Sequence, residues 1–592
     1  RSSLLHRCQK HLQKRARSTT MVKASNHDGA MDMDDYLQKY NHWLNAPFTD
    51  SQTKAELAAA GEPAEIEDRF YKDLEFGTGG LRGIMGAGTN RVNIYTIRKA
   101  SFGLANYILD NFGGEGKARG IAIAYDSRHN SQTFAEEAAK VFCACGIKTF
   151  LFDELQPTPV LSFAVRHLKC IAGVVITASH NPKEYNGYKV YNQHGCQLVP
   201  READQVIEYV NQVQDIAAVP VSDADWARAR GLLDGVGREV LDAYLDAVHA
   251  QSLYGDGQAK AGLKIVYTPL HGTGLKPVTS VLARDGFTSV FVVKEQQEPD
   301  GSFSTVRTPN PEETEALALG IAKAKAVGAD IVLGTDPDCD RVGVAVKHNR
   351  EYVHLTGNQI GALLVKFVLE QKKADLSPRS TLIKTIVTND LGAQIALDYG
   401  LNVVDTLTGF KFIGDKMTEF EQSGTNEFVA GYEESYGYLV GTHVRDKDAV
   451  VATMLICEMA AYHRKRGKTL ADALDELYQE YGFYLDHLDS FVLEGINGSA
   501  KIDAIMALLR TEGKDILPDV AEVIDYSRGI QDLPKSDVLK FILRDGSWIA
   551  VRPSGTEPKL KVYYSIRQPE ESLAKAKLEL IRGLVSRQII EI

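Results

Sequence analysis

The chain of 592 residues contains few cysteines, and none of them forms a C-x-x-C pair. Their odd number, seven, and their spacing exclude the usual structural zinc and thioredoxin-like sites and indicate a reducing compartment. Long apolar runs are absent too, because stretches such as Val450–Cys457 stop short of the roughly 18 residues that a membrane helix needs. We therefore expect no transmembrane segment and no membrane partner.

Positive charge is also scarce, since 67 Lys and Arg face 78 Asp and Glu for a net charge of −11. Nucleic acids and anionic membranes bind basic surfaces, so neither is an expected partner, although local basic groups can still bind small anions. Two nucleotide motifs are missing. Asp415 replaces the Walker A lysine in Gly409–Lys416, and Gly77–Gly83 lacks the third glycine of a dinucleotide site.

Acidic residues are absent from the first 27 positions, where seven basic residues precede Asp28. An Arg-rich segment without acids resembles an organelle transit peptide. In the alternative interpretation Met21 is the start, and residues 1–20 lie upstream of the protein. Residues 1–30 are expected to be a disordered or transit-like leader without catalytic function, and the protein to be cytoplasmic unless the transit peptide is real.

The rest of the composition, 44% hydrophobic and 24% charged, is typical of a globular protein. At roughly 150 residues per domain, the length corresponds to four domains. Helical and strand periods alternate, which predicts βαβ units in mostly parallel sheets. The expected strands are Gly120–Tyr125, Lys148–Phe152, Gly173–Thr177, Lys264–Thr268, Ser289–Val293, Asp330–Leu333, Thr381–Thr388 and Asn402–Thr406. The expected helices are Ile97–Phe112, Thr133–Cys145, Gly274–Arg284, Glu312–Val327 and Leu391–Tyr399.

Residues 501–592 separate helices from strands, which is typical of a smaller α+β domain. Its expected elements are the helix Ala500–Thr511, the strands Leu539–Leu543, Trp548–Arg552 and Lys559–Ser565, and a helix from Glu570. The links between domains are placed around Val219–Gly237, Glu351–Thr356 and Tyr481–Leu488. The fold class is therefore α/β, with three similar α/β modules followed by an α+β domain.

The first of four loops whose residues could carry out chemistry is the serine loop (Thr177–Pro182). It follows the apolar strand Ala172–Ile176. Ser179 then lies at the carboxyl end of a strand, where open α/β sheets bind ligands. The hydrolase motif G-x-S-x-G is absent, so this is not the nucleophile turn of a hydrolase. A serine activated by a metal or a base can still carry out covalent catalysis. The alternative is a polar turn that caps the strand.

The second, the aspartate loop (Asp336–Arg341), carries carboxylates at Asp336, Asp338 and Asp340. In an extended segment these side chains project to one side, which suits a divalent cation bound by oxygen. An EF-hand is excluded because Arg341 and Lys347 occupy the positions of its glycine and glutamate. The alternative is an acidic surface turn, in which the carboxylates would repel one another.

The third, the glutamate loop (Gly431–Gly437), contains Glu433 and Ser435 and precedes Arg445–Asp448. Acceptors and hydroxyls between glycines suit a polyhydroxylated ligand, and Arg445 and Lys447 could bind its anionic end. Alternatively, Asp446 or Asp448 favours the N-terminus of the apolar helix that follows.

The fourth, the arginine loop (Arg552–Lys559), offers one guanidinium, the hydroxyls of Ser554 and Thr556, and the N–H groups around Gly555. These groups form an anion cradle without Walker A, and phosphate is the expected anion. The alternative is a hairpin turn built on proline and glycine.

In this order and spacing, the four loops resemble those of the α-D-phosphohexomutase superfamily, and specifically its phosphoglucomutase/phosphomannomutase branch, from about Leu44 to the C-terminus. The resemblance implies a heart-shaped arrangement of three α/β modules with mixed sheets and a TATA-box-binding-protein-like C-terminal domain, each giving one loop to a central cleft. The implied segments are the leader at 1–30 and domains at 31–232, 233–355, 356–480 and 481–592.

The resemblance also implies roles for individual residues. Ser179 would be the phosphorylated nucleophile, and Ser179, Asp336, Asp338 and Asp340 would bind one Mg²⁺. The other catalytic residues would be His180, Lys189, Arg82 and Arg341, with either His180 or Lys189 moving the proton. The substrate-binding residues would be Thr408, Gly409, Phe410, Lys411, Glu433, Ser435, Lys447, Arg552, Ser554, Gly555 and Thr556.

The implied reaction interconverts α-D-glucose 1-phosphate and glucose 6-phosphate, with glucose 1,6-bisphosphate as intermediate and activator, in a monomer or weak homodimer whose fourth domain closes over the ligand. The glutamate loop reads Gly-Tyr-Glu-Glu-Ser-Tyr-Gly, unlike the Gly-Glu-Met-Ser-Gly-His of dual-specificity members, which favours glucose over mannose. The string around Ser179 also resembles a subgroup with phosphopentomutases and glucose-1,6-bisphosphate synthases. Phosphopentomutase, phosphomannomutase, metal-dependent sugar phosphatase and a non-catalytic relative are the alternatives.

Overall fold

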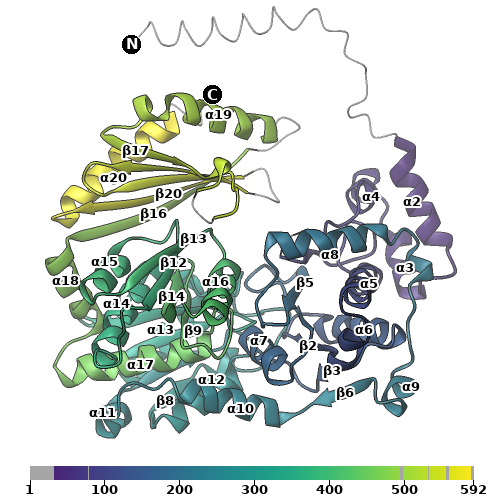
Figure 1. The fold of residues 1–592 in the computed structure, drawn as a ribbon, viewed down its shortest axis with the longest axis horizontal. Coiled ribbons are helices and arrows are strands. Elements are labelled where there is room, and N and C mark those ends of the chain that lie inside the picture. Colours follow the sequence, from purple (N-terminus) through teal and green to yellow (C-terminus); the bar gives the residue numbers. More distant parts are fainter. Residues whose placement is uncertain (1–32, 78, 494–497, 531–532, 555–558, 588–592) are drawn as a thin grey trace, which may run out of the picture. The chain divides into compact units, whose positions relative to one another are not determined.

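A computed structural model describes residues 33–77, 79–493, 498–530, 533–554 and 559–587 (Figure 1). The leader at 1–30 and the predicted site residues Gly555 and Thr556 lie outside these ranges. The described residues divide into two compact units, one within residues 33–73 and 87–90 and the other within residues 74–86 and 91–587. Among the described residues, no helix is long and apolar enough to cross a membrane.

The described part of the first unit is helical, with α2 (Met33–Asn45), α3 (Ser51–Ala59) and α4 (Pro63–Phe70). Asp50 begins α3 by accepting a hydrogen bond from the N–H of Thr53, the usual role of an N-cap carboxylate. The rings of Trp43 and Phe70 pack edge to face at 5.8 Å, and both are buried. This unit therefore has its own small aromatic core.

The first module of the second unit is a mixed sheet in the order β1-β5-β4-β2-β3-β6. All five residues of β2 are buried, as expected for a central parallel strand covered on both faces. Its strands are β1 (Leu81–Ile84), β2 (Ile121–Tyr125), β3 (Thr149–Phe152), β4 (Ala172–Ile176), β5 (Tyr185–Asn192) and β6 (Leu233–Val236). Its helices are α5 (Ile94–Arg119), α6 (Ser131–Ala144), α7 (Thr158–His167), α8 (Pro200–Gln212) and α9 (Ala224–Ala229).

The second module has the strand order β11-β10-β9-β7-β8, in which β7, β8 and β9 are parallel and β10 and β11 form a hairpin. Its strands are β7 (Ile265–Thr268), β8 (Val290–Val292), β9 (Ile331–Thr335), β10 (Val342–His348) and β11 (Glu351–Leu355). Its helices are α10 (Arg238–His249), α11 (Gly257–Gly262), α12 (Leu275–Arg284) and α13 (Ala318–Val327).

The third module has the order β13-β12-β14-β15, and residues 449–461 of its helix α17 are all buried. Asp448 caps α17 by accepting from the N–H of Val450 and Val451, so this acid has the helix-terminal role that the sequence offered as an alternative. The strands are β12 (Ser380–Thr385), β13 (Asn402–Thr406), β14 (Glu427–Glu433) and β15 (Gly437–Val440). The helices are α14 (Gly357–Gln371), α15 (Leu391–Asp398), α16 (Phe410–Ser423), α17 (Ala449–Lys465) and α18 (Leu470–Tyr481).

The fourth module is an antiparallel sheet in the order β16-β20-β19-β18-β17, with two helices and an apolar core of its own. Its strands are β16 (Phe483–Val492), β17 (Val520–Asp525), β18 (Leu539–Leu543), β19 (Trp548–Pro553) and β20 (Lys559–Gln568), and its helices are α19 (Gly498–Ile516) and α20 (Glu571–Val585). Trp548 and Tyr563 pack with Ile386 and Leu407 of the third module. Three α/β modules and an α+β domain are thus confirmed.

The three expected links contain strands instead. β6 pairs with β3, so the first sheet extends past residue 232, the expected boundary. β11 pairs with β10 through Asn349 and Arg350, which both have positive φ, and this two-residue hairpin was missed because Arg350 stands where glycine is usual. β16 pairs with β20 over its whole length.

The helix expected at Glu312–Val327 is also shorter, because α13 begins only at Ala318 after a 3₁₀ turn at Thr314–Leu317. Asn310 holds the preceding residues in a turn, accepting from the N–H of Glu312 on its side chain and of Glu313 on its carbonyl. The Glu312 carboxylate meanwhile pairs with Arg341. These contacts replace the first turn of the expected helix.

Candidate active site

The serine loop leaves the carboxyl end of β4 and turns sharply at Ser179. This residue is 3% exposed and has a φ of 51°, in the left-handed region that residues other than glycine rarely adopt. Its N–H donates to Oγ1 of Thr177 at 2.8 Å. Its hydroxyl donates to Oδ2 of Asp336 at 2.6 Å and lies 3.2 Å from Nδ1 of His180. The turn therefore directs the Ser179 hydroxyl at the aspartate loop.

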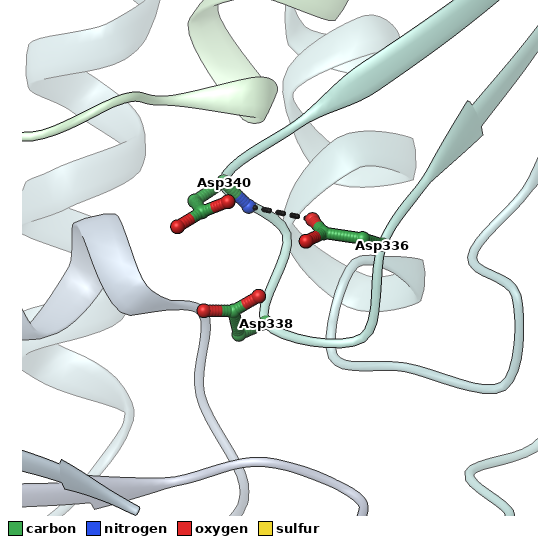
Figure 2. Close-up of side chains that lie close together, drawn as sticks. All are labelled: Asp336, Asp338 and Asp340. Carbon is green, nitrogen blue, oxygen red and sulfur yellow. Dashed lines mark hydrogen bonds between the residues drawn. The ribbon is translucent and has the colours of Figure 1, made fainter. Parts of the chain in front are cut away.

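The aspartate loop joins β9 to β10 and folds around its own first carboxylate. Oδ1 of Asp336 accepts from the N–H of Asp340 at 3.1 Å and of Arg341 at 3.0 Å. Figure 2 shows the carboxylates of Asp336, Asp338 and Asp340 converging on one region. One oxygen of each lies within 4.8 Å of the others, and all three residues are buried. The structure thus brings together the three acids that the sequence assigned to a metal.

These carboxylates fit a divalent cation. Oδ1 of Asp338 and Oδ1 of Asp340 are buried and have no hydrogen-bond partner among the described residues. Burial, followed by repulsion from Asp338 and Asp340, raises the pKa of Asp336 well above its ordinary value. A hard cation with oxygen ligands would satisfy the two orphaned oxygens and remove the repulsion, and Mg²⁺ has that preference.

Two buried ammonium groups partly balance the acids. Nζ of Lys189, on β5, lies 2.7 Å from Asp338 and 3.3 Å from Asp340, while Nζ of Lys447 lies 2.9 Å from Asp340. Burial opposes the charge of Lys189, but Asp338 and Asp340 outweigh it and raise the lysine's pKa. Lys447 was predicted to bind substrate, and here it contacts the aspartate loop as well. The two lysines therefore offset part of the negative charge of the three acids.

Arg82, Arg341 and His180 lie around the same point. Nη1 of Arg82, on β1, donates to Oδ1 of Asn181 at 3.3 Å, and Arg341 forms an ion pair with Glu312. Burial, with the positive charges of Arg341 and Arg82, lowers the pKa of His180 well below its ordinary value. These surroundings favour the neutral form of the His180 imidazole beside the Ser179 oxygen.

In the third module, the glutamate loop meets the segment before α16. Oε1 of Glu433 accepts from the N–H of Gly409 at 2.8 Å, where a φ of 118° requires glycine. Burial and the nearby Glu434 raise the pKa of Glu433 to about 7. Oγ1 of Thr408 is buried and has no hydrogen-bond partner in the part of the chain that the structure describes, and Ser435 is half-buried. These two segments thus combine an acidic acceptor with two hydroxyls.

Phe410 and Lys411 begin α16 and have different surroundings. Phe410 is 3% exposed within the main apolar core, so its side chain serves packing, and only its backbone is left to contact a ligand. Lys411 is half-buried, and its carbonyl accepts from Sγ of Cys196 at 3.3 Å. Burial lowers the pKa of Lys411 to about 8, with a further contribution from Arg552.

Of the arginine loop, the structure describes Arg552, Ser554 and Lys559. The N–H of Ser554 donates to the carbonyl of Lys559 at 2.7 Å, which closes a hairpin between β19 and β20. Arg552 is paired in register with Lys561 across these strands. Burial and the charge of Arg552 lower the pKa of Lys561. β19 and β20 thus pair on either side of this loop, whose residues 555–558 lie outside the described ranges.

Three residues beside these loops were missed from the sequence. Thr158, at the start of α7, donates from Oγ1 to Oδ2 of Asp338 at 2.8 Å, and Lys561 faces Arg552. Arg128 donates to carbonyls of the serine loop. Arg128 follows the carboxyl end of β2, so its position at a strand end was a usable signal. Thr158 and Lys561 have no such local signal, because a helix start and a strand pairing bring them in.

Comparison with known proteins places most of the second unit in one family. Four segments of the chain match the four domains of the phosphoglucomutase/phosphomannomutase family. They are alpha/beta/alpha domain I at residues 73–216, alpha/beta/alpha domain II at 242–349, alpha/beta/alpha domain III at 356–481 and the C-terminal domain at 502–582. The chain belongs to the phosphoglucomutase/phosphomannomutase family. Each of the four loops lies within a different one of these four segments.

Family members with known names are similar over nearly the whole chain. A phosphoglucomutase of Staphylococcus saprophyticus is 36% identical over 545 residues, covering 90% of this chain and 96% of its own, and one of Staphylococcus haemolyticus is 38% identical over 547 residues with the same coverage. Among solved structures, parafusin, a phosphoglucomutase from Paramecium, has a TM-score of 0.67 at 18% identity, covering 87% of this chain and 96% of its own. A phosphomannomutase from Thermus thermophilus has a TM-score of 0.65 at 23% identity, covering 87% and 99%. These two structures share the fold.

Proposed function

We propose that this chain is a phosphoglucomutase that interconverts α-D-glucose 1-phosphate and glucose 6-phosphate through a phosphorylated Ser179. The observation that carries the proposal is the 2.6 Å hydrogen bond from the Ser179 hydroxyl to Asp336, within a cluster of three buried carboxylates. The Staphylococcus relatives named phosphoglucomutase support the same reaction.

The chemistry proceeds in two transfers. In the first transfer the free hydroxyl of the hexose monophosphate bonds to the phosphorus as the bond between phosphorus and Oγ of Ser179 breaks, and the hydroxyl proton passes to Oγ, which gives glucose 1,6-bisphosphate and free Ser179. In the second transfer Oγ of Ser179 bonds to the opposite phosphorus as the bond from that phosphorus to the sugar oxygen breaks. The serine proton passes to the released sugar oxygen, and His180, 3.2 Å from Oγ, is the group that would carry it. Mg²⁺ held by Asp336, Asp338, Asp340 and phosphorylated Ser179 would stabilise charge on the transferring phosphoryl group.

The remaining residues bind the substrate and its charge. Arg82, Lys189, Arg341 and Lys447 surround the phosphoryl group with positive charge, while Glu433, Ser435 and the segment Thr408–Lys411 bind the sugar. The phosphate that is not being transferred binds to Arg552 and Ser554, and to Gly555 and Thr556, which lie outside the described residues. Lys561, opposite Arg552, adds a second cation to that subsite.

One chain supplies all four loops, so a monomer is sufficient for the reaction, and closure of the fourth module would exclude water from the phosphoserine. Glucose 1,6-bisphosphate would act as intermediate and activator, and Mg²⁺ as the metal. The cytoplasmic location stays a prediction.

The test is to compare kcat/KM for glucose, mannose, ribose and glucosamine 1-phosphates with added Mg²⁺ and glucose 1,6-bisphosphate. The proposal expects the highest value for glucose 1-phosphate. Preference for ribose 1-phosphate would make the chain a phosphopentomutase, and inorganic phosphate released faster than isomer would make it a phosphatase.

A further inference from the structure

Arg128 is an arginine that no step of the proposed reaction uses, although its side chain is fully buried beside the nucleophile. It follows β2, whose parallel neighbour β4 leads into the serine loop, with Tyr125 paired to Ile176. Two adjacent strands of one sheet therefore end with Arg128 and Ser179 at the same edge. A buried guanidinium requires partners for its donors, because it cannot lose its charge.

The partners of Arg128 are almost all carbonyls of one short segment. Nη2 donates to the carbonyl of Ser179 and, at 2.6 Å, to that of Asn181. Nη1 donates to the carbonyls of Pro182 at 2.9 Å and of Tyr185 at 3.1 Å. One planar group thus fixes four peptide units, which a lysine, with its single nitrogen, cannot do.

The Ser179 backbone needs such fixing, because its positive φ is unfavourable for a residue with a side chain. Its N–H is held by Oγ1 of Thr177, and its carbonyl is held by Arg128, so both peptide units that define its conformation are bound. The direction of the Ser179 hydroxyl depends on the backbone torsions φ and ψ of this residue, which those two peptide units set.

Arg128 is itself held from two sides. Asp126 accepts from the Arg128 N–H at 3.0 Å, and its Oδ2 lies 3.5 Å from Nε. On the other side the guanidinium lies over the ring of Phe303, 5.0 Å from its centroid, and Phe303 is 1% exposed. A buried ring of the second module thus packs against the Arg128 guanidinium.

We propose that Arg128 is the positioning residue of the serine loop, which holds Ser179 in its left-handed conformation and so keeps Oγ directed at the aspartate cluster. Arg128 does not touch the reacting atoms. The inference rests on the proposed function, because it assigns the held serine as the phosphoryl carrier.

The test measures kcat and KM for glucose 1-phosphate in Arg128→Met and Arg128→Lys, at a temperature where each variant is fully folded. Misplacing the nucleophile should lower kcat by roughly 100-fold in Arg128→Met and by roughly 10-fold in Arg128→Lys. KM should change by less than about 3-fold, since the sugar and phosphate subsites are intact.

Arg119→Met is the matched control. Arg119 also binds loop carbonyls of the first module, those of Lys169 and Cys170, but at the opposite end of the sheet. It should lose thermal stability while keeping kcat. A purely structural role for Arg128 would give the two methionine variants the same kcat per folded molecule, and this result would overturn the inference.

If Arg128→Met does not fold, Thr177→Val removes the other restraint on Ser179 with little change in shape. A kcat lowered by roughly 10-fold would support the inference, and an unchanged kcat would overturn it. Wild-type chain that fails to isomerise glucose 1-phosphate would instead contradict the proposed function, so the two failures are distinguishable.

Discussion

The Ser179 hydroxyl donates a 2.6 Å hydrogen bond to Asp336, a residue 157 positions further along the chain. The serine follows β4 of the first module and the aspartate follows β9 of the second, so the contact joins the carboxyl ends of strands from two different sheets. A nucleophile and a metal ligand that touch in this way allow one cation to bind both.

The first prediction concerns the cation. Asp338→Asn should weaken Mg²⁺ binding by roughly 100-fold or more, because it removes one charged oxygen ligand from a small buried set. Isothermal titration of the purified chain with MgCl₂ measures the affinity directly. Asp330→Asn, just before the other end of β9, changes a half-buried carboxylate bound to the N–H of Lys264 and should leave the affinity unchanged. Equal Mg²⁺ affinity in both variants would contradict the assignment.

Gly272 tests whether the aspartate loop depends on close packing from behind. A Cβ at this position would lie 2.4 Å from Cα and 2.6 Å from the carbonyl oxygen of Pro337. Gly272→Ala should therefore displace the loop, lower the free energy of unfolding by about 1–3 kcal/mol and weaken Mg²⁺ binding. Urea unfolding with and without Mg²⁺ gives both quantities. Gly257→Ala, where nothing lies within 4 Å of the added carbon, should be neutral in both, and a neutral Gly272→Ala would refute this view of the packing.

The pKa of Lys411, lowered by burial to about 8, predicts a pH limit on substrate binding. The amine is protonated below that pH and neutral above it, so its attraction for a sugar phosphate is present at low pH and lost as the pH rises through about 8. The profile of kcat/KM, which reports the free enzyme, should fall there. In Lys411→Arg the group stays charged, so this fall should move to higher pH, whereas Lys416→Arg on the same helix should keep the wild-type profile. An unmoved fall in Lys411→Arg would show that another group is responsible.

The short sequence motifs of the four loops were the part of this site that could be predicted. Each loop directly follows or joins an apolar strand, so the sequence alone placed Ser179 and Asp336 at strand ends. The sequence could not identify the residues that contact these loops from other parts of the fold. Thr158 does so from the start of a helix, Arg128 from the end of a neighbouring strand, and Lys561 by pairing across two strands. The direction of the side chains could not be predicted from the sequence either. Phe410 lies in the segment expected to bind sugar, yet it packs into the core because α16 places it on the buried face.

The same limit explains the fold errors. β6 and β11 are short and carry polar residues, so their apolar pattern is weak, and only pairing with β3 and β10 makes them strands. At Glu312 the sequence favours a helix, but its carboxylate pairs with Arg341, 29 positions away, and Asn310 holds the segment in a turn instead. Tertiary contacts overrode local preference in each case.

The central claim, that Ser179 carries the phosphoryl group, is tested most directly by comparing wild type with Ser179→Ala for conversion of glucose 1-phosphate to glucose 6-phosphate, with Mg²⁺ and glucose 1,6-bisphosphate present. Circular dichroism should show the same fold for both proteins. The account predicts that wild type turns over and carries one phosphate on Ser179 by mass spectrometry, while Ser179→Ala loses all measurable isomerisation. Isomerisation at the wild-type rate in Ser179→Ala would contradict it.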